Sequence, residues 1–266
     1  MGAGDIATAP AGASGPDEAT ARLLDSLVAA NDEVTVFTAG DNAYESGSLS
    51  EYLSYYEPTR GRHKPITRPS PGNHDYVTPG AAGYFDYFGA AAGDRTKGYY
   101  AYDLGAWRIY SLNSEIAHGA RSPQAQWLRS DLAANPTVKC VLGYWHRPRF
   151  SAGTHGSDKS MKALWQALYD HKADVVVAGH DHSYQRFAPQ TSTGGTDPAN
   201  GIREFVVGTG GRSHYGFANP IANTEAYNTD TYGVLKLTLH SSSYDFEFVP
   251  EAGRTYSDTG TAAPCH

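Results

Sequence analysis

Residues 175–182 read VVVAGHDH, and this stretch decides how the rest of the chain is interpreted. Three consecutive valines form a short apolar run that is typical of a strand buried on both faces. The run ends in His180 and His182, which point to the same side of an extended segment because they are two residues apart. Gly179 before them permits a tight backbone turn. Paired imidazoles at a strand end suit ligands for neighbouring metal ions.

Four other places in the chain carry metal-competent side chains, and three of them follow an apolar run, at 34–37, 65–66 and 141–145. The side chains at these four places are Asp5, Asp41, Tyr44, Asn73 and His146. Taken alone, a Gly-Asp pair is usually a turn and an Asn-His-Asp triplet is usually a solvated loop. Their recurrence predicts that they meet at one edge of a sheet, where α/β folds assemble their sites.

Three segments have the pattern of helices: 17–31, 122–132 and the residues from 157 to 168. Pro16 suits the first position of the first helix, and acidic residues follow it where they complement the helix dipole. Apolar residues recur in each segment at helical spacing. Such stripes are far more typical of a core-facing surface than of a cofactor site.

Short β-rich runs alternate with these helices. They lie at 34–37, 138–144, 175–177 and 205–207, with a predicted hairpin at 99–104 and 107–112 and a predicted antiparallel pair within 234–249. This order predicts a layered α/β fold with strands buried on both faces. The chain has no internal repeat, and its polar stretch at 191–200 is too short for a domain linker. We therefore expect one domain over 1–266.

The composition limits the class of partner. The 266 residues are 40% apolar and 18% charged, which is typical of a globular protein, and the formal net charge is -7. No run of Lys or Arg marks a nucleic-acid-binding surface. No apolar stretch approaches the roughly 20 residues needed to span a bilayer. Small anionic substrates remain compatible with this charge, because bound cations can outweigh a mildly acidic surface.

Two cysteines, Cys140 and Cys265, leave two interpretations open. They are either unrelated thiols or a disulfide that ties the C-terminal tail to the domain in an oxidising compartment. The chain shows no export signal at its start, and we expect that one has been removed from a secreted or extracellular protein.

The ordered series of motifs resembles the calcineurin-like metallophosphoesterase superfamily, and within it the purple acid phosphatases. The series consists of Gly4-Asp5, Gly40-Asp41-x-x-Tyr44, Gly72-Asn73-His74-Asp75, His146 and Gly179-His180-x-His182. Ala7 stands where many relatives have a ligand histidine, and Tyr44 stands where purple acid phosphatases have a tyrosinate. The resemblance implies a four-layered α/β/β/α sandwich of two mixed β-sheets flanked by helices. Only four residues precede Asp5, fewer than a full strand would use.

The resemblance also implies which residues bind two metal ions. The first metal would take Asp5, Tyr44 and His182, the second would take Asn73, His146 and His180, and Asp41 would bridge them. Phenolate and carboxylate ligands favour Fe(III) at the Tyr44 site, while imidazole and amide oxygen suit a divalent Fe, Zn or Mn ion at the Asn73 site. Such a pair can polarise a phosphoryl oxygen and hold a hydroxide for in-line attack.

Two further histidines are expected to act on the substrate. The resemblance places His74 near the leaving group, where it would stabilise the transition state and donate a proton; the alternative is a structural histidine bonded to Asp75. His155 matches a substrate-facing histidine in the loop after His146. Arg147 and Arg149 in that loop either contact substrate or are simply solvated. The other histidines match no motif and are expected to be structural or on the surface.

The expected function is hydrolysis of phosphate monoesters, with broad specificity, by a metal-bound hydroxide. A phosphodiesterase with the same two-metal site is the alternative, because the sequence does not indicate how large the substrate pocket is. A non-catalytic phosphate-binding module is a third reading, although degenerate relatives usually lose ligands that this chain keeps.

Overall fold

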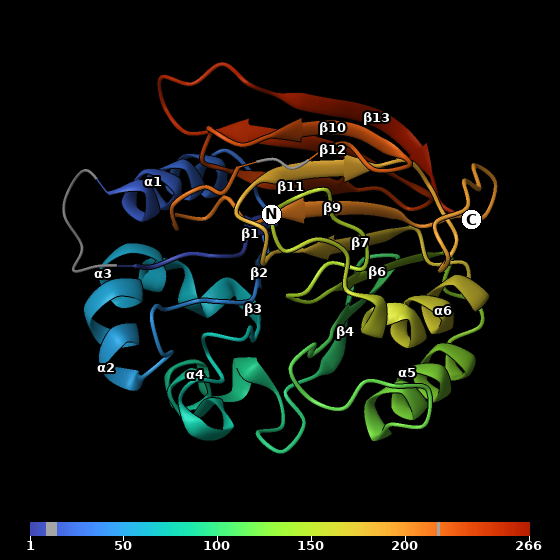
Figure 1. Ribbon diagram of the computed structural model, residues 1–266, viewed down its shortest axis with the longest axis horizontal. Coiled ribbons are helices and arrows are strands. Elements are labelled where there is room, and N and C mark those ends of the chain that lie inside the picture. Colours follow the sequence, from blue (N-terminus) through green and yellow to red (C-terminus); the bar gives the residue numbers. More distant parts are fainter. Residues whose placement is uncertain (9–14, 217–218) are drawn as a thin grey trace.

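The protein consists of two stacked β-sheets with helices outside them (Figure 1). The computed structural model describes residues 1–8, 15–216 and 219–266. In spatial order, the six-stranded sheet contains β13 (Asp258–Pro264), β12 (Ser243–Pro250), β11 (Gly233–Leu239), β1 (Gly2–Ala3), β2 (Val36–Ala39) and β3 (Thr67–Ser70). The seven-stranded sheet contains β10 (Thr224–Asn228), β8 (Tyr184–Phe187), β9 (Arg203–Val207), β7 (Val175–Ala178), β6 (Cys140–Tyr144), β5 (Trp107–Ser111) and β4 (Tyr100–Leu104).

Both sheets are mixed. Strands β1, β2 and β3 are parallel, as are β5, β6, β7 and β9, and the remaining pairs are antiparallel. Because parallel strands run the same way, the loops after them leave each sheet at one edge. The predicted sandwich of two mixed sheets flanked by helices is confirmed.

Helices cover the sandwich on its outer sides (Figure 1). Helices α5 (Pro123–Ala134) and α6 (Lys162–Asp170) pack on the seven-stranded sheet, and α1 (Pro16–Ala29) contacts β11 of the other sheet. A set of short helical segments lies beyond β3: α2 (Leu49–Glu51), a π-helical turn (Tyr52–Tyr56), α3 (Glu57–Thr59), 3-10 turns (Arg60–Ile66, Pro79–Ala81 and Gly89–Ala92) and α4 (Ala82–Phe88). A further 3-10 turn, Lys159–Met161, precedes α6. None of the described helices is both long and apolar enough to cross a bilayer.

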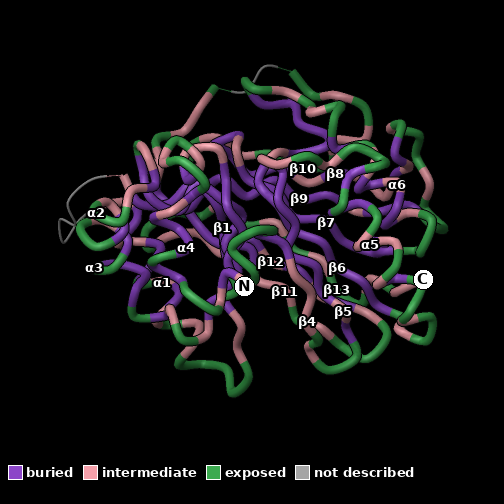
Figure 2. The backbone as a smooth tube through the Cα atoms, turned by 90° about the horizontal axis from the view of Figure 1, so that it is seen from below, coloured by how far each residue is buried: buried purple, intermediate pink, exposed green. Residues whose placement is uncertain are grey.

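The valine run 175–177 is buried on both faces, as predicted. Val175 and Val177 belong to the core between the sheets, whereas Val176 belongs to the core under α5 and α6. Alternate side chains of a strand point to opposite faces, so only a continuous apolar run satisfies both cores. Figure 2 shows the central strands as buried and the outer loops as exposed.

Most predicted elements are present with small shifts. The first helix spans Pro16–Ala29, and α5 begins at Pro123 after Ser122, whose Oγ accepts the Ala125 N–H at 3.1 Å. The hairpin β4–β5 and the antiparallel pair β11–β12 are confirmed. The two-residue strand β1 pairs with β2 on one side and β11 on the other, and this is enough to deliver Asp5.

The cysteines form a disulfide, which selects the second of the two interpretations. Cys140 opens β6 in the seven-stranded sheet, and Cys265 follows β13, the edge strand of the other sheet. The bond therefore fastens the C-terminal strand to the opposite sheet.

Candidate metal centre

The seven residues predicted as metal ligands lie together at one edge of the sandwich. Asp5 follows β1, Asp41 and Tyr44 follow β2, Asn73 follows β3, His146 follows β6, and His180 and His182 follow β7. Three of these strands belong to one sheet and two to the other. The site therefore forms where the carboxyl ends of parallel strands from both sheets meet.

The backbone is strained at three of these residues. Asp5, Asp41 and His180 have positive φ angles of 59°, 49° and 70°. Residues other than glycine rarely adopt this left-handed conformation, and it persists where the surrounding structure fixes a functional side chain. The backbone also passes close to the site at Gly72, where the Cβ of any other residue would lie 2.3 Å from Oδ1 of Asp41. These turns aim the side chains into the site.

One half of the site, called here the Tyr44 site, consists of Asp5, Asp41, Tyr44 and His182. The Tyr44 hydroxyl lies 2.8 Å from Oδ1 of Asp5, 3.2 Å from Oδ2 of Asp41 and 3.3 Å from Nε2 of His182. Asp5 and Tyr44 are at most 1% exposed. Two carboxylates, a phenol and an imidazole thus surround one small buried volume.

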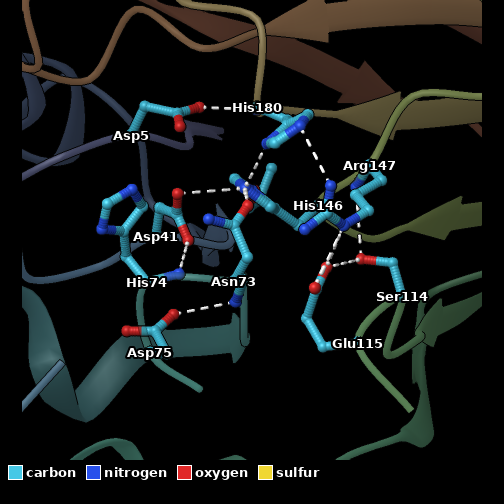
Figure 3. Close-up of polar contacts among 12 residues, drawn as sticks. Asp5, Asp41, Asn73, His74, Asp75, Ser114, Glu115, His146, Arg147 and His180 are labelled. Atoms are coloured by element: carbon cyan, nitrogen blue, oxygen red, sulfur yellow. Dashed lines mark hydrogen bonds and ion pairs between the residues drawn. The ribbon is translucent and has the colours of Figure 1, made fainter. Parts of the chain in front are cut away.

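The other half, called here the Asn73 site, consists of Asp41, Asn73, His146 and His180 (Figure 3). Nε2 of His146 lies 3.1 Å from Oδ2 of Asp41, 3.2 Å from Oδ1 of Asn73 and 3.1 Å from Nδ1 of His180. Ligand atoms of Asp41, His146 and His180 all lie within 4.8 Å of one another. Asp41 is common to both halves.

Outer contacts orient two of the imidazoles. Nδ1 of His146 lies 2.9 Å from the Ala39 carbonyl oxygen, and Nδ1 of His182 lies 2.8 Å from the Ser213 carbonyl oxygen. A carbonyl accepts a hydrogen bond, so Nδ1 of each ring carries the proton. Nε2 of each ring then faces the site, which is the arrangement typical of metal-bound histidine.

The close contacts in the Asn73 site shift the pKa values of His146, Asp41 and His180. Burial lowers the pKa of His146, but the Asp41 carboxylate outweighs it and raises that pKa to about 10. Burial likewise raises the pKa of Asp41, yet the charge and hydrogen bond of His146 hold it well below its usual value. Burial, the charge of His146 and that of Arg147 lower the pKa of His180 to about 2. A proton on His146 therefore compensates the buried carboxylates in the metal-free form.

The donor set fits two cations. Buried carboxylates need compensating positive charge, and here two of them converge with three imidazoles, an amide oxygen and a phenol. The phenol is neutral in the metal-free form, because burial and the charges of Asp41 and Asp5 raise the pKa of Tyr44 well above 10. A cation bound beside it would favour the phenolate.

Both histidines predicted to act on substrate lie at the rim. The His74 ring packs on the Tyr44 ring with centroids 4.4 Å apart, and its Nδ1 contacts the Glu45 carbonyl oxygen at 2.6 Å. Its ring nitrogen thus bonds to this carbonyl rather than to Asp75, the partner in the structural alternative. Exposed His155 stacks on the His180 ring with centroids 4.4 Å apart.

Asp75 instead organises the loop that carries Asn73. Its carboxylate accepts the Gly72 N–H at 2.8 Å, the Asn42 side-chain amide at 3.0 Å and the Tyr52 hydroxyl at 2.6 Å. Burial, and then the charge of Asp41, raises its pKa to about 6.

The two arginines of the loop after His146 have different surroundings. Arg149 is 7% exposed and donates to the Ser192 carbonyl oxygen at 2.8 Å, while its guanidinium stacks over Phe150. It is a structural residue. Arg147 lies at the site, with Nη1 3.2 Å from Nε2 of His180.

Sequence reasoning missed two further residues at the rim. Tyr215 stacks on His182 with ring centroids 3.9 Å apart, and Arg212 lies over the Tyr44 ring at 4.8 Å. Both residues lie in the segment after β9 and its glycines, and the approach of this segment to the site was not predicted from the sequence. His214, expected to be structural or on the surface, is half-buried and contacts the His182 carbonyl oxygen through Nδ1 at 3.0 Å.

Known proteins are similar to this chain in sequence and in fold. The family model described as calcineurin-like phosphoesterase matches residues 2–184, more than half of the chain. Purple acid phosphatase 22 of Arabidopsis thaliana is 28% identical over 143 residues, which cover 51% of this chain and 32% of that protein. Purple acid phosphatase 21 of the same plant is 32% identical over 118 residues, covering 42% and 26%. The matched part is thus about a third or less of these relatives' length.

Solved structures with the same fold include a purple acid phosphatase from yellow lupin seeds. Its TM-score is 0.80 at 23% identity, over 97% of this chain and 52% of that one. The Plasmodium protein GAP50, described as the anchor in the inner membrane complex, has a TM-score of 0.73 at 11% identity, over 100% of this chain and 88% of that one. At these identities the likeness concerns the fold alone. The match of the family model over residues 2–184 shows that this chain belongs to the calcineurin-like phosphoesterase family, within which it resembles the purple acid phosphatases.

Proposed function

We propose that this protein is a two-metal phosphatase that hydrolyses phosphate monoesters with broad specificity. The observation that carries the proposal is the position of Asp41, whose Oδ2 lies 3.2 Å from the Tyr44 hydroxyl and 3.1 Å from Nε2 of His146. One carboxylate is therefore shared by two complete donor sets. A phosphate-binding module without catalysis would not need both sets intact.

The two donor sets suit different ions. The proposed assignment is Fe(III) at the Tyr44 site and divalent Fe, Zn or Mn at the Asn73 site, because phenolate and carboxylates are harder donors than imidazoles. When bound, such a pair supplies Lewis acidity to phosphoryl oxygens and lowers the pKa of a water molecule to around 7, which provides a hydroxide nucleophile. Exposed His155, which stacks on His180, marks the side from which a small phosphorylated substrate would reach the site.

The chain's own residues bind and orient the substrate from that rim. His74 donates its Nδ1 proton to the Glu45 carbonyl oxygen, and its packing on Tyr44 fixes the ring. In its protonated form Nε2 is a second donor, and we assign it to stabilising charge and protonating the leaving group. His155 is proposed to contact the substrate over His180.

Relative rates on two aryl esters test the proposal directly. The metal-loaded protein is expected to hydrolyse p-nitrophenyl phosphate with a higher kcat/KM than bis-p-nitrophenyl phosphate. A preference for the diester would replace the proposal with the phosphodiesterase alternative, and no turnover of either ester in protein with two bound metals would indicate a binding module.

Tyr44→Phe tests the ion at the Tyr44 site. A phenolate bound to Fe(III) gives a visible charge-transfer band, and the phenylalanine variant lacks the oxygen that produces it. We expect the purified protein to be coloured and the variant to lose the band while its cooperative unfolding is retained. Metal analysis of a colourless, fully active wild-type protein containing only zinc or manganese would contradict the iron assignment.

His74→Ala tests the acid. We expect kcat to fall about 100-fold, within the range typical of a positioned general acid, while both metals are retained. Retention is expected because Asn73 and the His74 backbone N–H, which donates to Asp41 at 2.7 Å, are unchanged. The matched control is His171→Ala, which removes an exposed histidine after α6. A His74→Ala rate equal to that of the control would remove His74 from the mechanism.

We also propose that the protein is secreted or extracellular. The disulfide between Cys140 and Cys265 supports this location, because such bonds persist in oxidising compartments. The test is to look for the protein in the culture medium of cells that express its gene, and retention of all of it inside the cells would contradict the proposal.

A further inference from the structure

Arg147 is held beside the Asn73 site by a nearly buried carboxylate (Figure 3). Its Nε lies 2.9 and 3.0 Å from the two carboxylate oxygens of Glu115. The Glu115 side chain is 9% exposed, and that of Arg147 is 30% exposed. Ser114 completes the group, because its Oγ donates to Glu115 at 2.8 Å and accepts the Arg147 backbone N–H at 3.2 Å. These contacts fix the position of the Arg147 guanidinium beside His180.

The support leaves the outer end of the guanidinium facing the site. Glu115 engages Nε, while Nη1 lies 3.2 Å from Nε2 of His180. If Nδ1 of His180 binds a metal, the ring proton must be on Nε2. Arginine is always protonated, so Nη1 is a donor as well. Two N–H donors then converge with no acceptor between them, and an anion placed against both would satisfy them.

The number of phosphate oxygens makes this contact selective. A phosphomonoester dianion has three non-bridging oxygens, and a phosphodiester has two. Two ions held by the seven predicted ligands would polarise two of these oxygens. A third oxygen exists only in the monoester, and the two ions alone would leave it without a partner.

We propose that Arg147, positioned by Glu115, binds the third non-bridging oxygen of the substrate and thereby selects phosphomonoesters over phosphodiesters. This inference rests on the proposed function and names a specificity residue for it. Glu115 is a positioning residue, since it acts only through the guanidinium. The negative charge of Glu115 would also offset the repulsion between the Arg147 guanidinium and a cation bound at the Asn73 site.

The test compares four proteins: wild type, Arg147→Ala, Arg147→Lys and Glu115→Gln. In Arg147→Ala, kcat/KM for p-nitrophenyl phosphate is expected to fall about 10- to 100-fold, the loss typical of one charge-assisted hydrogen bond. The value for bis-p-nitrophenyl phosphate should change less than about 3-fold. Lysine should restore part of the loss, because it keeps the charge but not the planar fork. Glu115→Gln should raise KM for the monoester more than it lowers kcat.

Binding of inorganic phosphate gives a readout that is independent of turnover. Equilibrium dialysis of metal-loaded protein should show the phosphate Kd rising in Arg147→Ala by about the same factor as the monoester loss. The control is Arg95→Ala, which removes an exposed arginine paired with Asp86 and should leave the Kd unchanged. This control matches the change in net charge.

Two results would overturn the inference: an unchanged phosphate Kd in Arg147→Ala, or equal losses on monoester and diester. Failure of the proposed function would look different. A wild-type protein that prefers diesters refutes the monoesterase assignment, whereas the effect of Arg147→Ala on phosphate Kd still decides whether Arg147 contacts phosphate.

Discussion

Asp41→Asn is expected to reduce monoesterase activity by at least about 1,000-fold and to lower the metal content below two ions per chain. Loss of a single donor that stabilises a transition state already costs 10²- to 10³-fold, and Asp41 serves both halves of the site. An amide is neutral and has only one acceptor oxygen, so it cannot place negative charge on two ions. Steady-state kinetics and elemental analysis of the same preparation measure both effects.

The control for this substitution is Asp103→Asn, which makes the same chemical change at an exposed aspartate paired with Arg108. Circular dichroism and cooperative unfolding should show that both variants are folded. An Asp41→Asn protein that kept two ions per chain and more than a tenth of the wild-type rate would contradict the bridging role.

Loss of the disulfide is expected to have the largest effect on stability. Cys140 and Cys265 are 125 residues apart, and closing a loop of this size restricts the unfolded chain strongly. The chain-entropy model gives almost 5 kcal/mol for such a loop, and measured losses are typically about 2–5 kcal/mol. We therefore expect Cys265→Ser to lower the free energy of unfolding by several kcal/mol. Urea unfolding of the oxidised wild type and the variant measures the difference.

A reductant supplies the matched comparison. It should destabilise the wild type to the level of Cys265→Ser and leave the variant unchanged. Kinetics below the unfolding transition should be nearly normal in the variant, because the bond lies at the start of β6 whereas His146 follows the end of that strand. The disulfide would be contradicted if the reductant left the free energy of unfolding of the wild type unchanged and mass spectrometry found two free thiols.

The sequence was sufficient for the elements whose pattern is local. The run 175–177 had to be a strand buried on both faces, and α5 had to begin near Ser122 and Pro123, because periodicity and capping depend on neighbouring residues. Strands β8 and β13 were not predicted. Arg186 of β8 is stabilised by Asp258 of β13 at 2.7 Å, a partner 72 residues away. No local pattern contains such a pair.

For the candidate site, too, some features follow from local sequence and others only from tertiary structure. The sequence by itself determined the ligand types, their order and their place after strands, since these are properties of single segments. The resemblance already implied a bridging role for Asp41. Only the tertiary structure brings Tyr44, which follows a strand of one sheet, and His146, which follows a strand of the other, to its carboxylate. The tertiary structure also separated Arg147 from Arg149. Glu204 of β9 accepts the Arg149 backbone N–H at 2.9 Å and fixes that residue inside, whereas Glu115 holds Arg147 at the rim. The carboxylate that contacts the Arg149 backbone and the one that contacts the Arg147 side chain are both distant in sequence.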